Sequence, residues 1–572
     1  MILDARDVPA KSEFKCDVAI VGAGAGGMSV ARELLKSSLE VILLEGGGYH
    51  EEKDTQELYR GEVAGPGYHG ELHRTRRRRF GGSTTVWGGR CATLSAVDFE
   101  TRDYLPYSGW PISRDEMDGY YERAHEHCQC GSYSYQAQEA LPQGHLPLIP
   151  GFQSNDVTQD LIWRFSLPTD FGKRDSAALK SSQRFSVYLH ANCLGLRSTA
   201  DGAQVTGLRV ASLRGNEFVV RAKYYVLAAG CLETARLMLV STDSSPKGLG
   251  NQRDLVGRFY GGHMTGDLCT ATFTPKGGPV IWNYERSNEG VYCRRALTLQ
   301  PETIRREQLQ NLRVTLSHPP IPDASHGNGI LSAAYLVKRF LVDKIPPEFS
   351  KALSETSYRD VRSHLKNVIL DTPRLVSFSL HWLRWRILAE RKFPSISFPS
   401  PNQTYCLHFD GEQAPNPENR VTLGEDRDAL GLPRLRVHWQ SSERDVESVL
   451  RCFKIIKRDF ERCGVARMNS SDAEVEQNIR QGALVGAHQF GATRMAADPS
   501  RGVVDANCCV HGVDNLFIAT SAVFPTGGYS NPVLTITALG IRLADHLKAI
   551  SERKPVVRTG SGASNSGRLL AV

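Results

Sequence analysis

Residues 16–45 constrain the fold more than any other stretch. Residues 16–21 (CDVAIV) are a short apolar run typical of a buried strand, and the helix-like segment MSVARELLKS begins at residue 28. Between them, Gly22, Gly24 and Gly27 have the spacing G-x-G-x-x-G. The first glycine permits a tight turn, the second lets the backbone approach a pyrophosphate, and the third lets helix and strand pack closely. The chain is therefore predicted to begin with a Rossmann-like dinucleotide-binding unit.

A second strand supplies the acid that such a unit needs. Residues 40–44 (EVILL) lead directly into Glu45, which lies 45 − 27 = 18 residues past Gly27. This spacing is near that of the carboxylate that binds the ribose hydroxyls of a dinucleotide. A glycine-rich turn without a ligand would explain neither the acid nor the strands. These residues alone do not distinguish NAD from FAD.

A second glycine loop follows an arginine run. Residues 80–90 (FGGSTTVWGGR) contain four glycines with hydroxyl side chains between them. Such a loop suits close passage by a large planar or phosphate-bearing ligand. The run before it, residues 74–79 (RTRRRR), is interpreted as a solvated or anion-facing segment, because no second basic cluster supports nucleic-acid binding. Arg90 either pairs with a pyrophosphate or braces the loop.

The C-terminal block contains the candidate catalytic residues. Residues 515–519 (NLFIA) read as a strand, after which Asn531 and Pro532 begin an apolar helix. Asparagine is a good N-cap and proline a favoured first residue, so this helix start carries free N–H groups and partial positive charge. It suits a buried anion such as a reduced flavin ring, although Asn531 as a cap alone is the alternative. His488 has a free pKa near neutrality, which suits a base, but a lone histidine is more often structural.

Taken together, these blocks resemble the glucose–methanol–choline (GMC) oxidoreductases. The matching pieces are VGAGAGG, FGGSTTVWGG, VLAAGCLETARLML at residues 226–239, and the C-terminal stretch with His488 and Asn531. The chain is most similar to the branch of pyranose oxidases, fructose dehydrogenase large subunits and related sugar or cyclitol dehydrogenases. That branch has an asparagine where glucose oxidase has a second histidine.

The resemblance implies an α/β fold: a Rossmann-like FAD-binding domain of the GMC / p-hydroxybenzoate hydroxylase type, with an α+β substrate domain on a mostly antiparallel sheet. It implies FAD rather than NAD, His488 as catalytic base, and Asn531 as hydrogen-bond donor to the substrate oxygen. The residues implied at the cofactor are Gly22, Gly24, Gly27, Glu45, Gly81, Gly82, Ser83, Thr84, Asn192, Cys193, Ala229, Gly230 and Pro532.

Val86 marks a departure from several sugar oxidoreductases of this branch. Those enzymes link FAD covalently through a histidine in the second glycine loop, and the matching position here is Val86. Valine has no nucleophilic nitrogen, so we expect non-covalent FAD.

The domains are expected to alternate along the chain. We assign 14–110, 186–264 and 486–550 to the FAD-binding domain, 111–185 and 265–485 to the substrate domain, and 1–13 and 551–572 to flexible termini. Residues 187–196 read as one strand and 415–439 as a hairpin that by resemblance walls the substrate cavity, near Gln413 and His438. Residues 375–392, rich in Trp and Arg, are expected to pack on their own domain; lying on a membrane surface is the alternative.

Composition limits the remaining classes. The 572 residues exceed one ordinary core, and a net charge of +7 from 69 basic and 62 acidic residues is too diluted to indicate nucleic acid. The 13 cysteines are scattered, and the crowded spacing of His125, Cys128 and Cys130 does not match a metal site. No signal-peptide core or apolar run of membrane-spanning length is visible, so a cytoplasmic protein is expected.

The sequence thus predicts an FAD-dependent dehydrogenase or oxidase of a polyhydroxylated CH–OH substrate: a sugar, aminosugar or cyclitol, with antibiotic biosynthesis as one setting. The electron acceptor is oxygen, a quinone or a redox protein. Two alternatives stay open: a lyase of the same fold that keeps flavin for structure, and the catalytic subunit of a complex that passes electrons to a separate haem or iron–sulfur chain. The sequence has no C-x-x-C-H or iron–sulfur spacing of its own.

Overall fold

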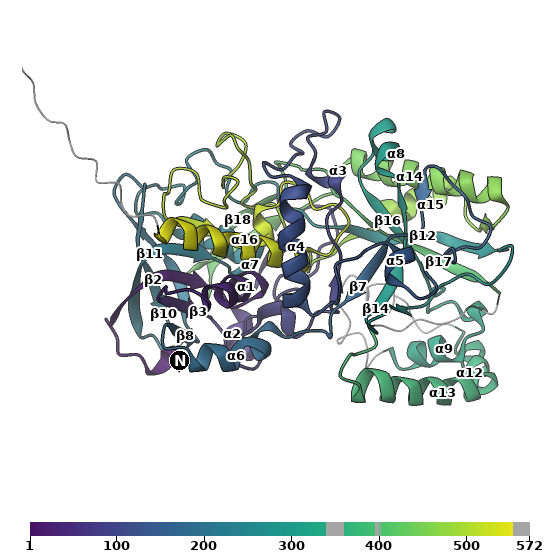
Figure 1. Ribbon diagram of the computed structural model, residues 1–572, viewed down its shortest axis with the longest axis horizontal. Helices are drawn as coiled ribbons and strands as arrows, with labels where there is room; N and C mark the ends of the chain where they lie inside the picture. Colours follow the sequence, from purple (N-terminus) through teal and green to yellow (C-terminus); the bar gives the residue numbers. More distant parts are fainter. Residues whose placement is uncertain (339–359, 395–399, 401, 553–572) are drawn as a thin grey trace, which may run out of the picture.

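The computed structural model describes residues 1–338, 360–394, 400 and 402–552. Two regions lie side by side along its long axis (Figure 1). One is built on an eight-stranded sheet and the other on a seven-stranded sheet. A single cluster of buried apolar side chains runs through both regions, so they share one continuous core.

The eight-stranded sheet carries the predicted dinucleotide-binding unit. Its strand order is β1-β8-β3-β2-β11-β10-β9, and β22 also pairs with β11. The β2–β3, β2–β11 and β11–β22 pairs are parallel, and β10 is antiparallel to both of its neighbours. The bounds are β1 Ile2–Asp4, β2 Glu13–Val21, β3 Val41–Leu44, β8 Phe185–Leu189, β9 Asn192–Ser198, β10 Val205–Ala211, β11 Glu217–Leu227 and β22 Leu516–Ile518.

Three helices pack together beside the first glycine turn. Helix α16 (Pro532–Glu552) packs against α1 (Ala25–Leu34) and α4 (Arg114–Cys128). The α1–α16 contact is close because Gly540 faces Ser29, where a Cβ on the glycine would lie 3.0 Å from the serine Cβ. This packing brings the start of the last helix to the first glycine turn, although about 500 residues separate them in the sequence.

The seven-stranded sheet is antiparallel throughout, as the sequence predicted for the substrate domain. Its order is β20-β12-β17-β16-β15-β6, with β21 on β12. In Figure 1, α14 (Glu443–Cys463) and α15 (Asp472–Arg480) lie on one side, and α9 (Gly329–Leu336), α12 (Val361–Leu370) and α13 (Thr372–Trp382) on the other. The bounds are β6 Val157–Thr158, β12 Met264–Phe273, β15 Leu297–Leu299, β16 Leu312–Ser317, β17 Thr404–Gly411, β20 Ala466–Met468 and β21 Ala483–Leu484.

The predicted hairpin forms, and Asp428, Leu430 and Leu432 between its strands line the large cavity described below. Strands β18 (Arg420–Arg427) and β19 (Pro433–His438) pair antiparallel, and β19 continues to β4 (Gly61–Ala64) in a separate three-stranded sheet. The hairpin packs on α7 (Gly230–Val240) of the cofactor region. A further sheet of order β13-β14-β7-β5 comprises Glu285–Arg286, Tyr292–Arg295, Ile162–Phe165 and Arg90–Cys91.

Three other expectations differ from the structure. Residues 1–13 are not a loose extension, because β1 adds an edge strand to the large sheet. Residues 187–196 are not one strand: His190 takes the left-handed conformation (φ 56°) and separates β8 from β9. Residues 111–185 divide between the regions, since α4 packs on α16 whereas β6 joins the substrate sheet. Of the expected flexible C-terminus, residues 553–572 lie outside the described residues.

Across the described ranges, no helix combines the length and apolar character needed to cross a membrane.

Candidate active site

The first glycine turn forms as predicted. Gly22 (φ +104°) follows β2, and α1 begins just after Gly24. A Cβ on Gly27 would lie 1.9 Å from the carbonyl oxygen of Gly22, whereas a Cβ on Gly24 would meet no atom within 4 Å. Gly27 therefore serves helix–strand packing, while Gly24 faces open space. That space, at the N-terminal end of α1, fits a pyrophosphate.

Glu45 braces this turn from the end of β3. Its Oε2 accepts a hydrogen bond from the Ala23 N–H at 2.9 Å, and its Oε1 accepts one from the Gly47 N–H at 2.9 Å. Burial raises the pKa of this carboxyl above its ordinary value. A carboxylate has further lone pairs. Bracing the turn and binding a ribose hydroxyl are therefore compatible roles for Glu45.

The second glycine loop lies directly against the first. The Gly81 N–H donates to the Ala23 carbonyl at 3.0 Å, and a Cβ on Gly82 would lie 2.8 Å from the Gly24 Cα. Both Gly81 (φ +92°) and Gly82 (φ +55°) are left-handed, a conformation that glycine adopts without strain. Close approach of the two loops explains why glycines recur at both.

Both loops open onto one cavity of about 1360 Å³. This exceeds the usual size of a small-molecule pocket, as expected if one cavity holds both a dinucleotide and a substrate. Val86 also lines it, with an exposed side chain. Of the residues predicted from sequence, the cavity is lined by Gly22, Gly24, Glu45, Gly82, Ser83, Thr84, Cys193, Ala229, Gly230, His488, Asn531 and Pro532.

Three predicted cofactor residues lie behind the cavity wall. Gly27 and Gly81 support the two glycine turns, as described above. Asn192 lines a smaller neighbouring pocket, and its Oδ1 accepts a hydrogen bond from Arg78 Nη2 at 2.9 Å. Gln413 and His438, expected near the substrate, do not line the large cavity. Gln413 is instead structural, because its Oε1 accepts a hydrogen bond from Trp439 Nε1 at 3.0 Å.

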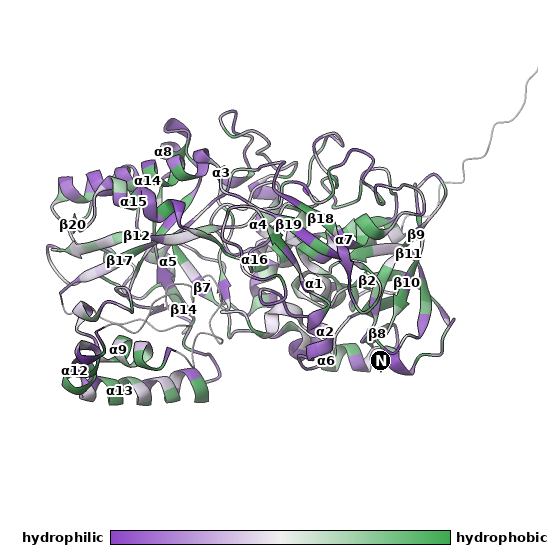
Figure 2. Ribbon diagram, turned by 180° about the vertical axis from the view of Figure 1, so that it is seen from behind, coloured by the Kyte–Doolittle hydropathy of each residue, from purple (hydrophilic) through white to green (hydrophobic). Residues whose placement is uncertain are grey.

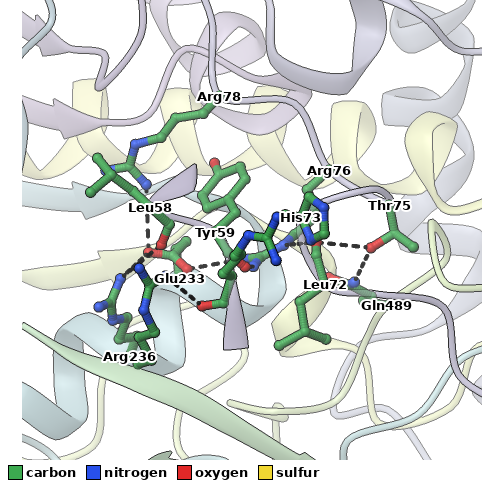
Figure 3. Close-up of polar contacts among 12 residues, drawn as sticks. Leu58, Tyr59, Leu72, His73, Thr75, Arg76, Arg78, Glu233, Arg236 and Gln489 are labelled. Carbon is green, nitrogen blue, oxygen red and sulfur yellow. Dashed lines mark hydrogen bonds and ion pairs between the residues drawn. The ribbon is translucent and has the colours of Figure 1, made fainter. Parts of the chain in front are cut away.

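The arginine run turns toward the cavity rather than lying free in solvent. Arg76 and Arg78 both approach the buried carboxylate of Glu233, at 3.0 and 3.6 Å (Figure 3). Arg236 bridges Glu233 and Asp428, at 3.4 and 2.7 Å. All five residues line the cavity. Three guanidinium groups against two carboxylates leave one positive charge in excess, which supports the anion-facing interpretation of this run.

His488 and Asn531 meet inside the cavity. The structure places Asn531 Nδ2 2.9 Å from His488 Nε2, although 43 residues separate them in the sequence. Asn531 stands immediately before α16, and the other amide atom, Oδ1, is buried without a hydrogen-bond partner in the described protein. An orphaned acceptor at this depth is costly unless a ligand satisfies it.

A second histidine, His263, sets the tautomer of the first. His263 Nε2 lies 3.2 Å from the Gly527 carbonyl oxygen, which can only accept, so this nitrogen carries the proton. The Nδ1 of neutral His263 must then accept from His488 Nδ1, 2.9 Å away. His488 therefore carries its proton on Nδ1 and exposes the lone pair of Nε2 to the Asn531 amide. The chain of contacts leaves the cavity-facing nitrogen of His488 unprotonated.

Burial keeps both rings neutral. It lowers the pKa of His263 to about 4 and, helped by the neighbouring His263, lowers the pKa of His488 well below its ordinary value. A neutral imidazole with a free lone pair is the protonation state that a general base requires.

Charged pairs from the seven-stranded sheet lie near the two histidines, since Asp410 and Arg313 influence the pKa of both rings. Arg313 Nε donates to Asp410 Oδ2 at 2.9 Å, and its guanidinium lies 3.5 Å from the ring centre of Trp163. Burial alone would raise the pKa of Asp410, but Arg313 holds it well below the ordinary value. Beside this pair, His408 Nδ1 lies 2.7 Å from Asp267 Oδ1. Asp267, His408 and Asp410 line the cavity.

Sequence reasoning missed His263 and these charged pairs. His263 ends the segment GRFYGGH, residues 257–263, just before the boundary between the expected FAD-binding and substrate domains. The available signal was the glycine pair before it, because glycines permit the close approach that seats His263 against residues 488 and 527. Asp410 and Arg313 gave no local signal, since they pair across neighbouring strands 97 residues apart.

Comparisons with known proteins find similarity to GMC oxidoreductases. A family model described as GMC oxidoreductase matches residues 415–540. The 6'''-hydroxyparomomycin C oxidase of Streptomyces lividus is 23% identical over 95% of this chain and 93% of its own length. The 2-methyl-1,2-propanediol dehydrogenase of Mycolicibacterium austroafricanum is 24% identical over 94% of this chain and 96% of its own.

A crystal structure of formate oxidase has a similar fold, with a TM-score of 0.52 and 15% identity over 95% of this chain and 99% of that one. The match of residues 415–540 to the GMC oxidoreductase model and the two full-length relatives show that this chain is similar to GMC oxidoreductases, the resemblance that its glycine loops and C-terminal block had indicated.

Proposed function

We propose that this chain is an FAD-dependent oxidoreductase that oxidises a CH–OH group of a polyhydroxylated substrate: a sugar, an aminosugar or a cyclitol. One observation carries the proposal. His488 Nε2 and Asn531 Nδ2 lie 2.9 Å apart in a cavity that both glycine loops also line. A base and a hydrogen-bond donor are thus held together in the cavity that would also hold the dinucleotide.

The reacting hydroxyl binds between these two side chains. It donates its proton to His488 Nε2, and its oxygen accepts a hydrogen bond from Asn531 Nδ2. Both groups, which satisfy each other in the free protein, then have a partner in the complex. FAD, when bound, supplies the acceptor for the hydride that leaves the carbon. His488 takes the hydroxyl proton, and Asn531 holds the oxygen in the geometry for attack.

The rest of the cavity suits a substrate with several polar groups. The unpartnered Oδ1 of Asn531 offers an acceptor to a second substrate group. Among the other lining residues, Asp267, His408 and Asp410 offer further polar atoms. The two relatives described above are named for hydroxyl-bearing compounds, which supports the same class of substrate. The start of α16 faces the cavity through Pro532 and favours negative charge there.

The cofactor is held without a covalent bond to the second glycine loop. Val86 lines the cavity at the loop position where related sugar oxidoreductases have the linking histidine, and its side chain has no nucleophile. Acid precipitation should therefore release all yellow colour into the supernatant. Colour that stays with the pellet would contradict this proposal.

Anaerobic reduction tests the proposed chemistry. Purified yellow protein is mixed under argon with sugars, aminosugars, cyclitols and simple alcohols, and flavin absorbance is followed. We expect at least one polyol to bleach the native protein, while His488→Ala keeps its flavin but bleaches at least 100-fold more slowly, as for loss of a general base. His438→Ala, which alters a histidine outside the cavity, is the matched control and should bleach like the native protein.

Two results would contradict the proposal. If no alcohol bleaches the flavin, the redox role fails and a lyase with a structural flavin is favoured. If His488→Ala bleaches at the native rate, the assignment of the base is wrong. If the flavin does bleach, the electron acceptor remains to be identified. Oxygen uptake during turnover would identify an oxidase, and turnover only with a dye, quinone or redox protein would identify a dehydrogenase.

A further inference from the structure

The helices α12 and α13, with the π-helical turn η5 (Leu383–Leu388), present an apolar face to solvent. Of the seventeen large apolar side chains exposed in the described part of the chain, nine lie between Val361 and Leu388. Ile369 is 71% exposed and Leu380 63% exposed. Neither α13 nor η5 buries any residue. The segment packs on its own domain through one side only, and its other side is exposed to solvent.

The exposed residues follow helical spacing. Val376, Leu380, Leu383 and Ile387 succeed one another at intervals of four, three and four residues, which places them along one side of the helix. Leu365 and Ile369 are one turn apart on α12. We call this set the outer face; it comprises Leu365, Ile369, Val376, Leu380, Leu383 and Ile387. Figure 2 shows apolar residues along both helices at the outer edge of the substrate region.

The opposite side of the same segment is anchored to the protein. Trp382 and Trp385 pack against an aromatic cluster that includes Phe393. Arg386 Nη1 donates to the Phe393 carbonyl at 2.8 Å, and the guanidinium of Arg286 lies 4.7 Å from the Trp385 ring centre. The inner side thus fixes the helix in place and turns its apolar stripe outward. An outward stripe on an anchored helix is an interaction surface rather than a misplaced core.

Charge indicates the kind of partner. Between residues 361 and 388 there are five basic residues and one acid, Asp371, which gives a net charge of 5 − 1 = +4. Arg362, Lys366, Arg374 and Arg384 are exposed around the outer face. A second copy of the same face would meet like charges. An apolar stripe with a basic rim instead matches a bilayer surface that contains anionic lipid.

This surface adjoins the candidate active site. Ile330, Leu331 and Ala334 of α9 line the large cavity. Helix α12 packs on α9 from outside, where the His364 ring stacks on Tyr335 with 4.1 Å between ring centres. We propose that the outer face docks the protein on the surface of an anionic membrane, with α9 between the bilayer and the cavity. This inference does not depend on the proposed reaction.

Vesicle co-sedimentation of the full-length holoprotein tests the proposal. We expect binding to vesicles of phosphatidylcholine with 30% phosphatidylglycerol, weaker binding to phosphatidylcholine alone, and loss of binding as salt increases. The double variant Leu380→Glu/Ile387→Glu should bind at least tenfold more weakly. Leu213→Glu alters an exposed leucine elsewhere and is the matched control, with native binding expected.

A second variant separates the charge from the apolar stripe. Arg374→Gln/Arg384→Gln should lower binding to anionic vesicles by roughly fivefold for each arginine and leave binding to neutral vesicles unchanged. All altered side chains are exposed, so flavin content and thermal unfolding should stay native. Absence of binding to anionic vesicles, or native binding by the Leu380→Glu/Ile387→Glu variant, overturns the proposal. So does a lipid-free dimer that this variant converts to monomer, because the outer face would then join two copies.

Discussion

Replacement of His263 tests how the proposed base is prepared. His263 contacts no substrate in the proposed complex; it acts through His488. His263 Nδ1 accepts a hydrogen bond from the protonated Nδ1 of His488 at 2.9 Å, and His263 Nε2 donates one to the Gly527 carbonyl. His263→Leu removes this acceptor. His488 is then free to carry its proton on Nε2, the nitrogen that must receive the substrate proton.

The structure sets the size of the effect. His263 is 1% exposed, so water does not replace the lost acceptor. Leaving one buried donor unsatisfied costs about 1–3 kcal/mol. Because about 1.4 kcal/mol corresponds to a factor of ten in rate, flavin reduction should slow by roughly 5- to 150-fold. His263→Asn supplies an oxygen near the position of Nδ1 and should recover most of this loss.

The assay is anaerobic stopped-flow reduction with a substrate that bleaches the native enzyme. The loss in His263→Leu should appear in the limiting rate of reduction, with flavin content unchanged and only a small change in the substrate dependence. A limiting rate equal to the native rate would refute the relay. If His263→Asn proved as slow as His263→Leu while both kept native flavin content, the hydrogen-bond explanation would also be wrong.

Further predictions concern the cofactor cradle, pH and the Arg313–Asp410 pair. Gly24→Val should yield folded protein without flavin, because the valine side chain enters open space that a pyrophosphate would fill. Gly27→Val should instead disrupt folding. Native flavin content in Gly24→Val would refute the placement of the pyrophosphate at Gly24. His488 must be unprotonated to act, and burial lowers its pKa well below 6.5, so kcat/KM should hold as pH falls through 6.5 and decline only at lower pH; half-loss at 6.5 or above would contradict this. Asp410→Ala should lower the free energy of unfolding by about 3–5 kcal/mol in denaturant titrations, because it leaves Arg313 buried without its partner.

The cofactor half of the fold is predictable because its signals are local. The strands before Gly22 and Glu45 and the glycine spacing between them all lie within residues 16–45. Steric requirements fix such a turn without reference to the rest of the chain. The break at His190 was missed because a histidine in the left-handed region has no sequence signature comparable with glycine. The path of residues 111–185 depends on packing partners such as α16 that lie far along the chain.

The candidate site divides in the same way. His488 and Asn531 were identifiable through the family resemblance, and the structure brings them together at 2.9 Å. Their roles stay predictions until the variants are measured. His263 and the Arg313–Asp410 pair emerge only from the tertiary structure, because the contacting residues are far apart in the sequence. Residues 263 and 488 are separated by 225 positions, and residues 313 and 410 by 97. Exposure of the outer face likewise depends on which side of α13 the aromatic cluster anchors.

The Arg313–Asp410 pair is better explained by function than by stability. A buried ion pair seldom stabilises a fold more than apolar residues of similar volume would, because both charges lose their hydration. The double variant Arg313→Met/Asp410→Leu should therefore unfold at a denaturant concentration near that of the native protein, unlike Asp410→Ala alone. At His488 the charges of the pair oppose each other, since Asp410 raises its pKa and Arg313 lowers it. Removal of both charges thus leaves the pKa of the base nearly unchanged but removes the polar atoms of Asp410 from the cavity lining. Weakened substrate binding with a near-native limiting rate of reduction would assign the pair to substrate recognition. Native substrate binding in the double variant would contradict a functional role for the pair.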